Sequence, residues 1–441
     1  MFENKQFIFE KQEILGADGV AERIEDLLGE RALRWYIAGI RGDDVIVEAT
    51  LGEKRADYDR LDSAGRGMTG HGVTGRSVAV SIIPTGVGCE VGGYAGDAAP
   101  ATRLLAATVD DLVTNPNAVN GSNFISLGDN VHYCEGLEID LFCKGLVDLY
   151  KPRANRVGLL IERCSEEALD VVYNVVNTAR AIYGVDIVDC VVTEERIGSR
   201  CVENASGAFV GTVDNPQVMF RACEALLERG ANAIAVTTNI QDLPHDAYVE
   251  HFEGRYPNPM GGIEAIISHS IVNRFGVPAA HAPMLNLKEL ALADNVVDAR
   301  GAGEMASASG LACVLIGLAK APHIRADRCH AAADILSADN LLAVVAPATC
   351  LGGIPAICAH ERGVPIIAVH ENATVLEVGA ESVGIGHVIE VQSYLEAAGV
   401  LTALREGIAI DTVKRPMRTL RPARTDRPQM AELRLAGEAG G

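Results

Sequence analysis

Residues 77–123 constrain the fold most strongly, because apolar and glycine-rich segments follow one another there in a defined order. The stretch opens with an apolar run, Val78–Ile83, which predicts a buried strand, and a glycine-rich turn follows it. Asp97 and Pro100 are typical of a helix start, and Asp111–Thr114 predicts a second strand. Because α/β folds bind ligands at the carboxyl ends of strands, this order predicts a ligand site.

Strand and helix patterns alternate along the rest of the chain, which predicts an α/β fold with mainly parallel sheets covered by helices. Further strands are predicted at 157–161, 186–192, 233–238, 277–281, 342–346, 365–370 and 387–391. Helices are predicted at 101–108, 166–183, 216–229, 262–275, 303–320, 353–362 and 393–405. The strands can form one sheet or two, and in the second case the boundary between the sheets lies near residues 151–155.

Five segments are expected. They are a small N-terminal α+β unit at 1–55, a Gly-rich linker or loop at 56–76, a first βαβ unit at 77–150, an α/β domain at 151–411, and a basic Pro/Arg-rich tail at 412–441. The N-terminal unit is predicted to hold a helix at 17–28 and two strands at 32–40 and 45–51.

Charge and cysteine content narrow the class of protein. The net charge is −21, which argues against nucleic acid as a partner because phosphates need a basic surface. The 11 cysteines include no C-x-x-C pair, as expected of reduced thiols in a cytoplasmic protein. No apolar segment is long enough for a signal peptide or a membrane span. We therefore expect a cytoplasmic protein with no membrane partner, and we expect a homo-oligomer.

The common nucleotide and hydrolase motifs are absent. The run from Gly86 to Gly92 misses the dinucleotide spacing, because Val91 stands where the third glycine is required. The sequence has no Gly-Lys-Ser/Thr loop, no H-E-x-x-H and no G-x-S-x-G.

Two glycine-rich turns are the predicted ligand-binding elements, because glycine lets the backbone approach a ligand and a following helix offers free N–H groups. An anion such as a carboxylate or phosphate would suit both turns, and tight turns that serve only packing are the alternative. With the asparagines that end predicted strands, the candidate binding residues are Gly86, Gly88, Gly92, Gly93, Asn117, Asn123, Asn239, Gly352 and Gly353.

The candidate catalytic residues lie near predicted strand ends. Cys350 precedes a predicted helix, whose N-terminus would lower the pKa of a thiol, although a small buried residue explains it equally well. His281, His370 and Glu371 end strands and suit general acid–base catalysis. Asp97 is a further candidate; helix capping alone would explain both Asp97 and Glu304.

No cofactor is predicted, but a divalent metal is possible. His269, His281, His370 and Glu371 have ligand types that bind such ions, although none of their spacings is diagnostic of a metal site.

Three sequence stretches resemble an uncharacterised family of bacteria and photosynthetic organisms, domain of unknown function 3326. They are PTGVGCEVGGYAGDAAPATRLLAA with LVTNPNAVNG, SHSIVNRFGVPAAHAP, and APATCLGGIPAICAHERGVPIIAVHEN. The resemblance covers roughly residues 77–395 and implies no particular activity or catalytic residue.

The residues themselves favour a metabolic enzyme that acts on a small anionic metabolite by acid–base or thiolate chemistry. Isomerase or racemase chemistry is the first choice, since Cys or His pairs suffice for it without a cofactor, and a lyase or hydrolase also fits. One alternative is a metal-dependent hydrolase, for example of a cyclic amide. Another is a non-catalytic ligand-binding protein.

Overall fold

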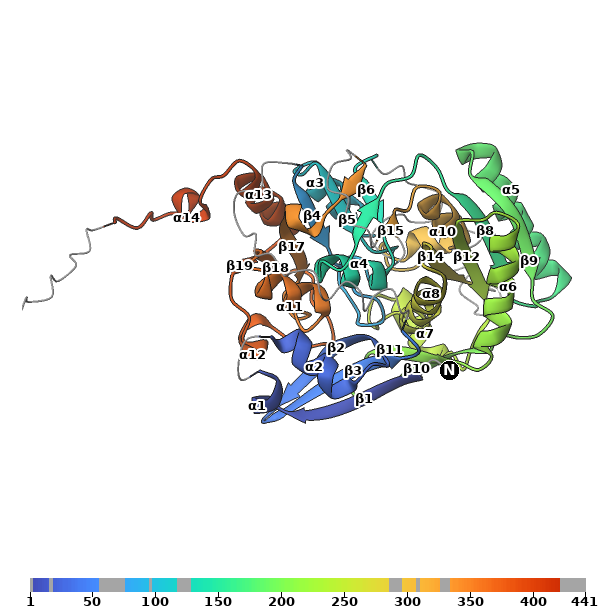
Figure 1. Cartoon of the computed structure of the whole chain (residues 1–441), viewed down its shortest axis with the longest axis horizontal. Coiled ribbons are helices and arrows are strands. Elements are labelled where there is room, and N and C mark those ends of the chain that lie inside the picture. Colours follow the sequence, from blue (N-terminus) through green and yellow to red (C-terminus); the bar gives the residue numbers. More distant parts are fainter. Residues whose placement is uncertain are drawn as a thin grey trace, which may run out of the picture.

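Two parallel β-sheets form the centre of the molecule in the computed structural model (Figure 1). The structure describes residues 3–15, 19–54, 76–94, 97–116, 128–284, 296–306, 310–325 and 334–420. The expected α/β class, with mainly parallel sheets and covering helices, is confirmed.

The larger parallel sheet has six strands, in the order β19-β18-β17-β4-β5-β6. These strands are β19 (Val388–Val391), β18 (Ile366–Val369), β17 (Leu341–Pro347), β4 (Val78–Ser81), β5 (Asp111–Thr114) and β6 (Val131–Tyr133). Its covering helices are α3 (Ala99–Ala106), α4 (Gly136–Cys143), α11 (Ile354–Glu361) and α13 (Tyr394–Arg405).

The second parallel sheet has four strands, in the order β14-β12-β8-β9. They are β14 (Ala279–Pro283), β12 (Ala233–Thr238), β8 (Arg156–Ile161) and β9 (Asp186–Val192). The helices packed on it are α5 (Glu166–Tyr183), α6 (Pro216–Glu228), α8 (Gly261–Phe275) and α10 (Leu311–Leu318).

The inner strands are buried on both faces, which explains why they are apolar at nearly every position; they include β4, β8, β12, β17 and β18. In β17, Val344 and Ala346 join one hydrophobic core, whereas Ala343 and Val345 join another. Successive side chains of a strand point to opposite faces, so one run of apolar residues serves two cores.

The N-terminal unit is an antiparallel three-stranded sheet with two helices, and it packs below the larger sheet in Figure 1. Its elements are β1 (Glu3–Glu10), α1 (Lys11–Ile14), α2 (Val20–Leu28), β2 (Ala32–Arg41) and β3 (Asp44–Leu51). The predicted helix and two strands are confirmed, and β1 is an element that the sequence patterns did not predict.

Two small sheets and several short helices complete the described fold. One sheet contains β11 (Phe209–Val213), β10 (Ser199–Glu203) and β13 (Ile240–Gln241), and the other β15 (His323–Arg325), β7 (Asp148–Tyr150) and β16 (Ile335–Leu336). The remaining helices are α7 (His245–Phe252), α9 (Ala302–Ala306), the 3-10 turn Ala338–Asn340, α12 (Ala380–Val383) and α14 (Ile410–Val413). None of the described helices is long and apolar enough to span a membrane.

The expected segments 77–150 and 151–411 do not each hold one parallel sheet. The chain does leave the larger sheet between these segments, but β17, β18 and β19 return to it and pair beside β4. Parallel strands must be joined by a long crossover connection, and the connection from β6 to β17 contains the whole second sheet. Within the helix predicted at 303–320, the described residues form α9 (Ala302–Ala306) and α10 (Leu311–Leu318), and residues 307–309 lie outside the described part of the chain.

Candidate functional site

A cavity of about 280 Å³ lies where the carboxyl ends of the two parallel sheets meet. The larger sheet contributes Ile83, Asn115 and Glu135, which follow β4, β5 and β6. The second sheet contributes His281 from the end of β14. Strand ends are thus where the site lies, as expected of an α/β fold.

The N-terminal sheet also supplies a wall of this cavity, through Arg34 on β2. Arg34 forms a two-pronged ion pair with Asp140 of α4, in which Nη2 donates to Oδ1 over 3.2 Å. Burial opposes the charge of Arg34, but attraction to Asp140 outweighs it and raises the Arg34 pKa above its ordinary value. The guanidinium is therefore a fixed positive charge in the cavity wall.

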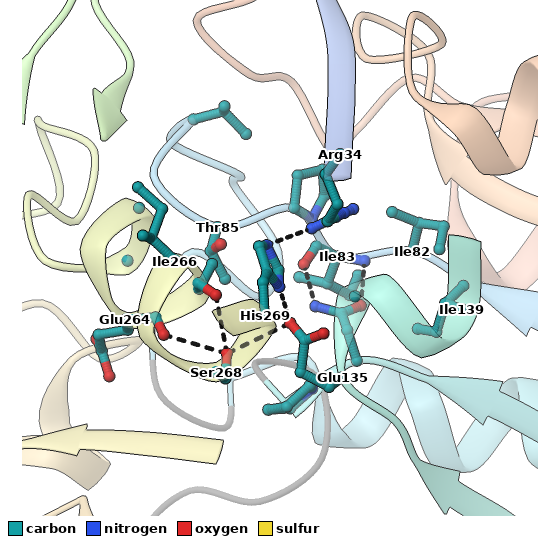
Figure 2. A pocket seen from close by; sticks show the side chains of 18 of the residues that line it. Arg34, Ile82, Ile83, Thr85, Glu135, Ile139, Glu264, Ile266, Ser268 and His269 are labelled. Atoms are coloured by element: carbon teal, nitrogen blue, oxygen red, sulfur yellow. Dashed lines mark hydrogen bonds and ion pairs between the residues drawn. The ribbon is translucent and has the colours of Figure 1, made fainter. Parts of the chain in front are cut away.

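His269 of α8 links Arg34 to Glu135 (Figure 2). Arg34 Nη1 lies 2.7 Å from His269 Nε2, while His269 Nδ1 contacts the Glu135 carboxylate. A guanidinium can only donate, so Nε2 must accept, and the imidazole proton then resides on Nδ1. Burial and the nearby Arg34 also lower the His269 pKa, which agrees with a neutral ring. The network assigns one direction of donation, from Arg34 through His269 to Glu135.

Glu135 is the acceptor at the end of this network. It caps the N-terminus of α4 and accepts from the Leu137 N–H over 2.6 Å. Ser268 Oγ lies 3.3 Å from Glu135, but it is closer to the carbonyl oxygens of Glu264 and Ala265 in its own helix. Burial alone would raise the Glu135 pKa, but His269, Arg34 and the Leu137 N–H lower it, so the group is a carboxylate.

A second polar cluster lies around Glu264, nearer the N-terminus of α8. His281 Nδ1 is 3.2 Å from Glu264 Oε2, and its Nε2 is 2.9 Å from the Thr238 hydroxyl. Figure 2 shows Glu264 on the opposite side of Ser268 from Arg34. The two clusters therefore face different parts of one cavity, and Thr238 fixes the His281 ring against Glu264.

Glu304 of α9 is the fourth carboxyl group in the cavity lining. It is 8% exposed, and its Oε2 has no hydrogen-bond partner among the described residues. Burial, with repulsion from Glu264 added, raises the Glu304 pKa to about 8. Glu304 is therefore a neutral acid at pH 7, whereas helix capping was the sequence-based alternative for it.

The glycines of the first turn do not line the cavity, although their neighbours Thr85 and Val87 do. Gly86, Gly88 and Gly92 have positive φ, and a Cβ on Gly92 would lie 2.1 Å from Ile83 Cγ2. Gly93 is equally crowded, with Cys89 O 2.2 Å from the position of a Cβ. The structure thus uses this turn for close packing, which was the alternative to anion binding.

The second glycine turn packs against the N-terminal sheet. Ile37 N donates to Gly352 O over 2.9 Å, and Gly353 forms an isolated bridge with Tyr36. Gly353 also lines the cavity.

Cys350 lines the cavity too, but burial raises the pKa of its thiol to about 12. The helix N-terminus was expected to lower this pKa; that expectation is wrong because the thiol lies in an apolar environment.

His370 and Glu371 lie outside the cavity on an exposed surface. His370 Nε2 is 3.4 Å from Glu390, and Glu371 accepts from the N–H of Tyr394 at the start of α13. Asp97 accepts from the N–H groups of Gly92 and Tyr94 and so stabilises the first turn; burial raises its pKa to about 6. In the structure, Glu371 caps a helix, Asp97 stabilises a turn, and His370 contacts a neighbouring carboxylate.

The predicted metal set is not brought together. His269 and His281 line the cavity, whereas the other two members, His370 and Glu371, do not. Within the described ranges no group of three or more His, Cys, Asp or Glu side chains is arranged to hold a metal ion. Asn239 donates its N–H to the buried Glu162, and Asn117 and Asn123 lie outside the described residues.

Sequence reasoning missed four of the residues that carry charge in the cavity. Arg34, Glu135, Asp140 and Glu264 were not among the candidate site residues. Glu135 could have been found from one local pattern. It is the first residue of an E-x-x-E segment, in which Glu138 completes a capping box with it. Arg34 has no such pattern, because its role depends on how two distant sheets pack.

A family model, described as a protein of unknown function, matches residues 78–414. The chain belongs to this family, DUF3326. A relative from Synechococcus sp., named an uncharacterized lipoprotein, is 37% identical over 76% of this chain and 92% of its own length. No solved structure matches the chain. The DUF3326 match begins after β3, so Arg34 lies outside it, while Glu135, Glu264, His269, His281 and Glu304 lie within it.

Proposed function

We propose that this DUF3326 protein is an enzyme that transfers protons on a small polar molecule bound in the central cavity, and that it is an isomerase or racemase. One observation carries the proposal: Glu264 and Glu304 share the cavity, and the charge of Glu264 helps to keep Glu304 protonated. A pair of carboxyl groups in opposite protonation states provides a base and an acid at once.

Glu264 is the proposed base, and His281 is its positioning partner. The Thr238 hydroxyl holds one nitrogen of His281, so that the other stays 3.2 Å from Glu264. A proton taken from the substrate by Glu264 can therefore be shared with an imidazole, which suits proton transfer near neutral pH. Glu304 then supplies a proton to the substrate from its neutral carboxyl group.

The Arg34–His269–Glu135 network is proposed to fix the wall against which the substrate lies. Its members are held by contacts among β2, α4 and α8, so the substrate meets a preorganised surface. The apolar remainder of the wall, which includes Ile82, Ile139 and Ile266, excludes water.

Proton-transfer chemistry is preferred to thiolate chemistry because burial raises the Cys350 pKa to about 12. It is preferred to metal-dependent hydrolysis because the cavity brings together two of the four predicted ligands. A ligand-binding protein without turnover remains the competing class, and the same experiment distinguishes it.

Solvent-deuterium exchange tests the proposal even while the substrate is unidentified. The full chain is incubated in D₂O with pools of small metabolites, and deuterium incorporation is followed by mass spectrometry. We expect incorporation into one chemical class with the wild type and a loss of at least about a hundredfold in Glu264→Gln. Glu371→Gln, a carboxylate outside the cavity, is the matched control and should retain exchange. Equal exchange in wild type and Glu264→Gln, or none from any pool, would contradict the proposal.

A cytoplasmic location also stays a proposal. The ten cysteines that the structure describes are all free, which supports a reducing compartment. Because the Synechococcus relative is named a lipoprotein, cell fractionation is the appropriate test.

A further inference from the structure

The cavity lining is unbalanced in charge. Among the described residues that line it, Arg34 is the only lysine or arginine, whereas Glu135, Asp140, Glu264 and Glu304 are acidic. Asp140 already occupies two nitrogens of Arg34, and His269 occupies the third. Glu135 and Asp140 therefore share a single guanidinium. An anionic ligand would enter against this excess of negative charge.

One acidic group is also unsatisfied. Glu304 is 8% exposed and lines the cavity, and its Oε2 has no partner in the part of the chain that the structure describes. Buried polar atoms are almost always hydrogen-bonded, so an unpaired oxygen at a cavity wall calls for a ligand that donates. Glu135 needs no such ligand, because His269 and the Leu137 N–H already donate to it.

The cavity wall also suits an organic cation. Tyr36, Tyr133 and Phe209 line the cavity together with aliphatic side chains. Aromatic faces attract ammonium groups, and an apolar wall accommodates the carbon skeleton that carries them.

We infer that the ligand of this cavity is a small molecule with a protonated amine, and that its ammonium group donates to Glu304 and Glu264. The inference rests on the proposed function, since it names the substrate class of the same site. It replaces the anionic metabolite that the glycine turns suggested, because Gly86, Gly88, Gly92 and Gly93 serve packing and do not line the cavity. The ammonium charge pairs with Glu264, and the neutral Glu304 carboxyl group accepts through its unpaired oxygen, so Glu304 keeps the proton that the proposed reaction requires.

Calorimetry with two probes of matched size and opposite charge, benzylamine and benzoate, tests the inference on the full chain. We expect benzylamine to bind and benzoate not to bind at the same concentration. In Glu264→Gln, which removes the charge that pairs with the ammonium group, the affinity should fall about tenfold or more. Glu371→Gln should bind benzylamine as the wild type does, and Glu304→Leu, which removes the accepting oxygen, is a second variant in case Glu264→Gln does not fold.

Three results would overturn the inference: binding of benzoate but not benzylamine, binding of neither probe, or a response to Mg²⁺ alone that Glu304→Gln abolishes. The outcome is separable from the proposed function. Deuterium exchange that depends on Glu264 would uphold proton transfer even if benzylamine does not bind. Benzylamine binding without deuterium exchange into any substrate would support the inferred ligand class and contradict the proposed enzymatic function.

Discussion

Arg34 and Asp140 form the ion pair that ties the N-terminal sheet to the cavity, and its strength depends on both partners being present. Asp140 is 1% exposed, so removal of Arg34 would leave a buried carboxylate without its counter-ion. We expect Arg34→Met to lower the free energy of unfolding by about 3–5 kcal/mol in urea. The double variant Arg34→Met/Asp140→Leu should recover much of this loss, since neither charge remains. A double variant no more stable than the single one would contradict this view of the pair.

The raised pKa of Glu304 predicts that the stability of the fold depends on pH. Its pKa is about 8 in the folded chain against an ordinary value of 4.5, so between these values the folded state binds more protons than the unfolded state. The contribution of Glu304 to stability is therefore fully present below about pH 4.5 and is lost as the pH rises toward 8. Thermal unfolding across this range should show a fall in the wild type that is smaller in Glu304→Gln. Parallel curves for the two proteins would contradict the assignment.

The first glycine turn predicts a packing effect at the scale of an element. Gly92 has φ +90°, and a Cβ there would lie 2.1 Å from Ile83 Cγ2. We expect Gly92→Ala to cost at least about 2 kcal/mol of stability, through both strain and collision. Gly207 is the matched control, because its φ is +80° but a Cβ would meet nothing within 4 Å. Gly207→Ala should cost about 1 kcal/mol, and equal losses in urea unfolding would count against the packing role.

The elements show why some predictions succeeded and others did not. Val78–Ser81 and Ala233–Thr238 were predictable strands because they are buried on both faces, and continuous apolar runs result. The three-residue strand β6 and the eight-residue strand β1 were missed, since β6 is short and β1 mixes exposed polar and apolar residues. The glycine turn was located correctly, but its use could not be inferred, because packing against Ile83 and ligand binding require the same residues.

At the scale of the whole molecule, the site depends on contacts between segments far apart in the chain. His281 was a candidate because it ends a strand, whereas Arg34 comes from an N-terminal sheet that reaches the cavity only through packing. The sequence likewise could not show that β17 returns to pair beside β4, which places Cys350 and Gly353 at the same cavity as Glu135.

Substitutions at the adjacent glycines Gly352 and Gly353 test how the N-terminal sheet packs against this part of the chain. A Cβ on Gly352 would lie 2.6 Å from Ile37 O in the N-terminal sheet, whereas a Cβ on Gly353 would meet only Pro355 Cδ at 3.7 Å. We expect Gly352→Ala to lower stability by about 1–3 kcal/mol and to speed amide hydrogen exchange in β2. Gly353→Ala should change both much less. Unchanged exchange in β2 of the first variant would show that the sheet does not depend on this contact.

The account depends most on the state of Glu304, a neutral acid in the same cavity as the charged Glu264. The direct measurement is an NMR titration of the full chain labelled with ¹³C at the glutamate side-chain carboxyl carbon, with Glu304→Gln used to assign the resonance. We predict one carboxyl group that titrates near pH 8 and is missing from the variant. If the resonance lost in Glu304→Gln titrates near the ordinary value of 4.5, Glu304 is ionised at neutral pH and the proposed acid–base pair does not exist.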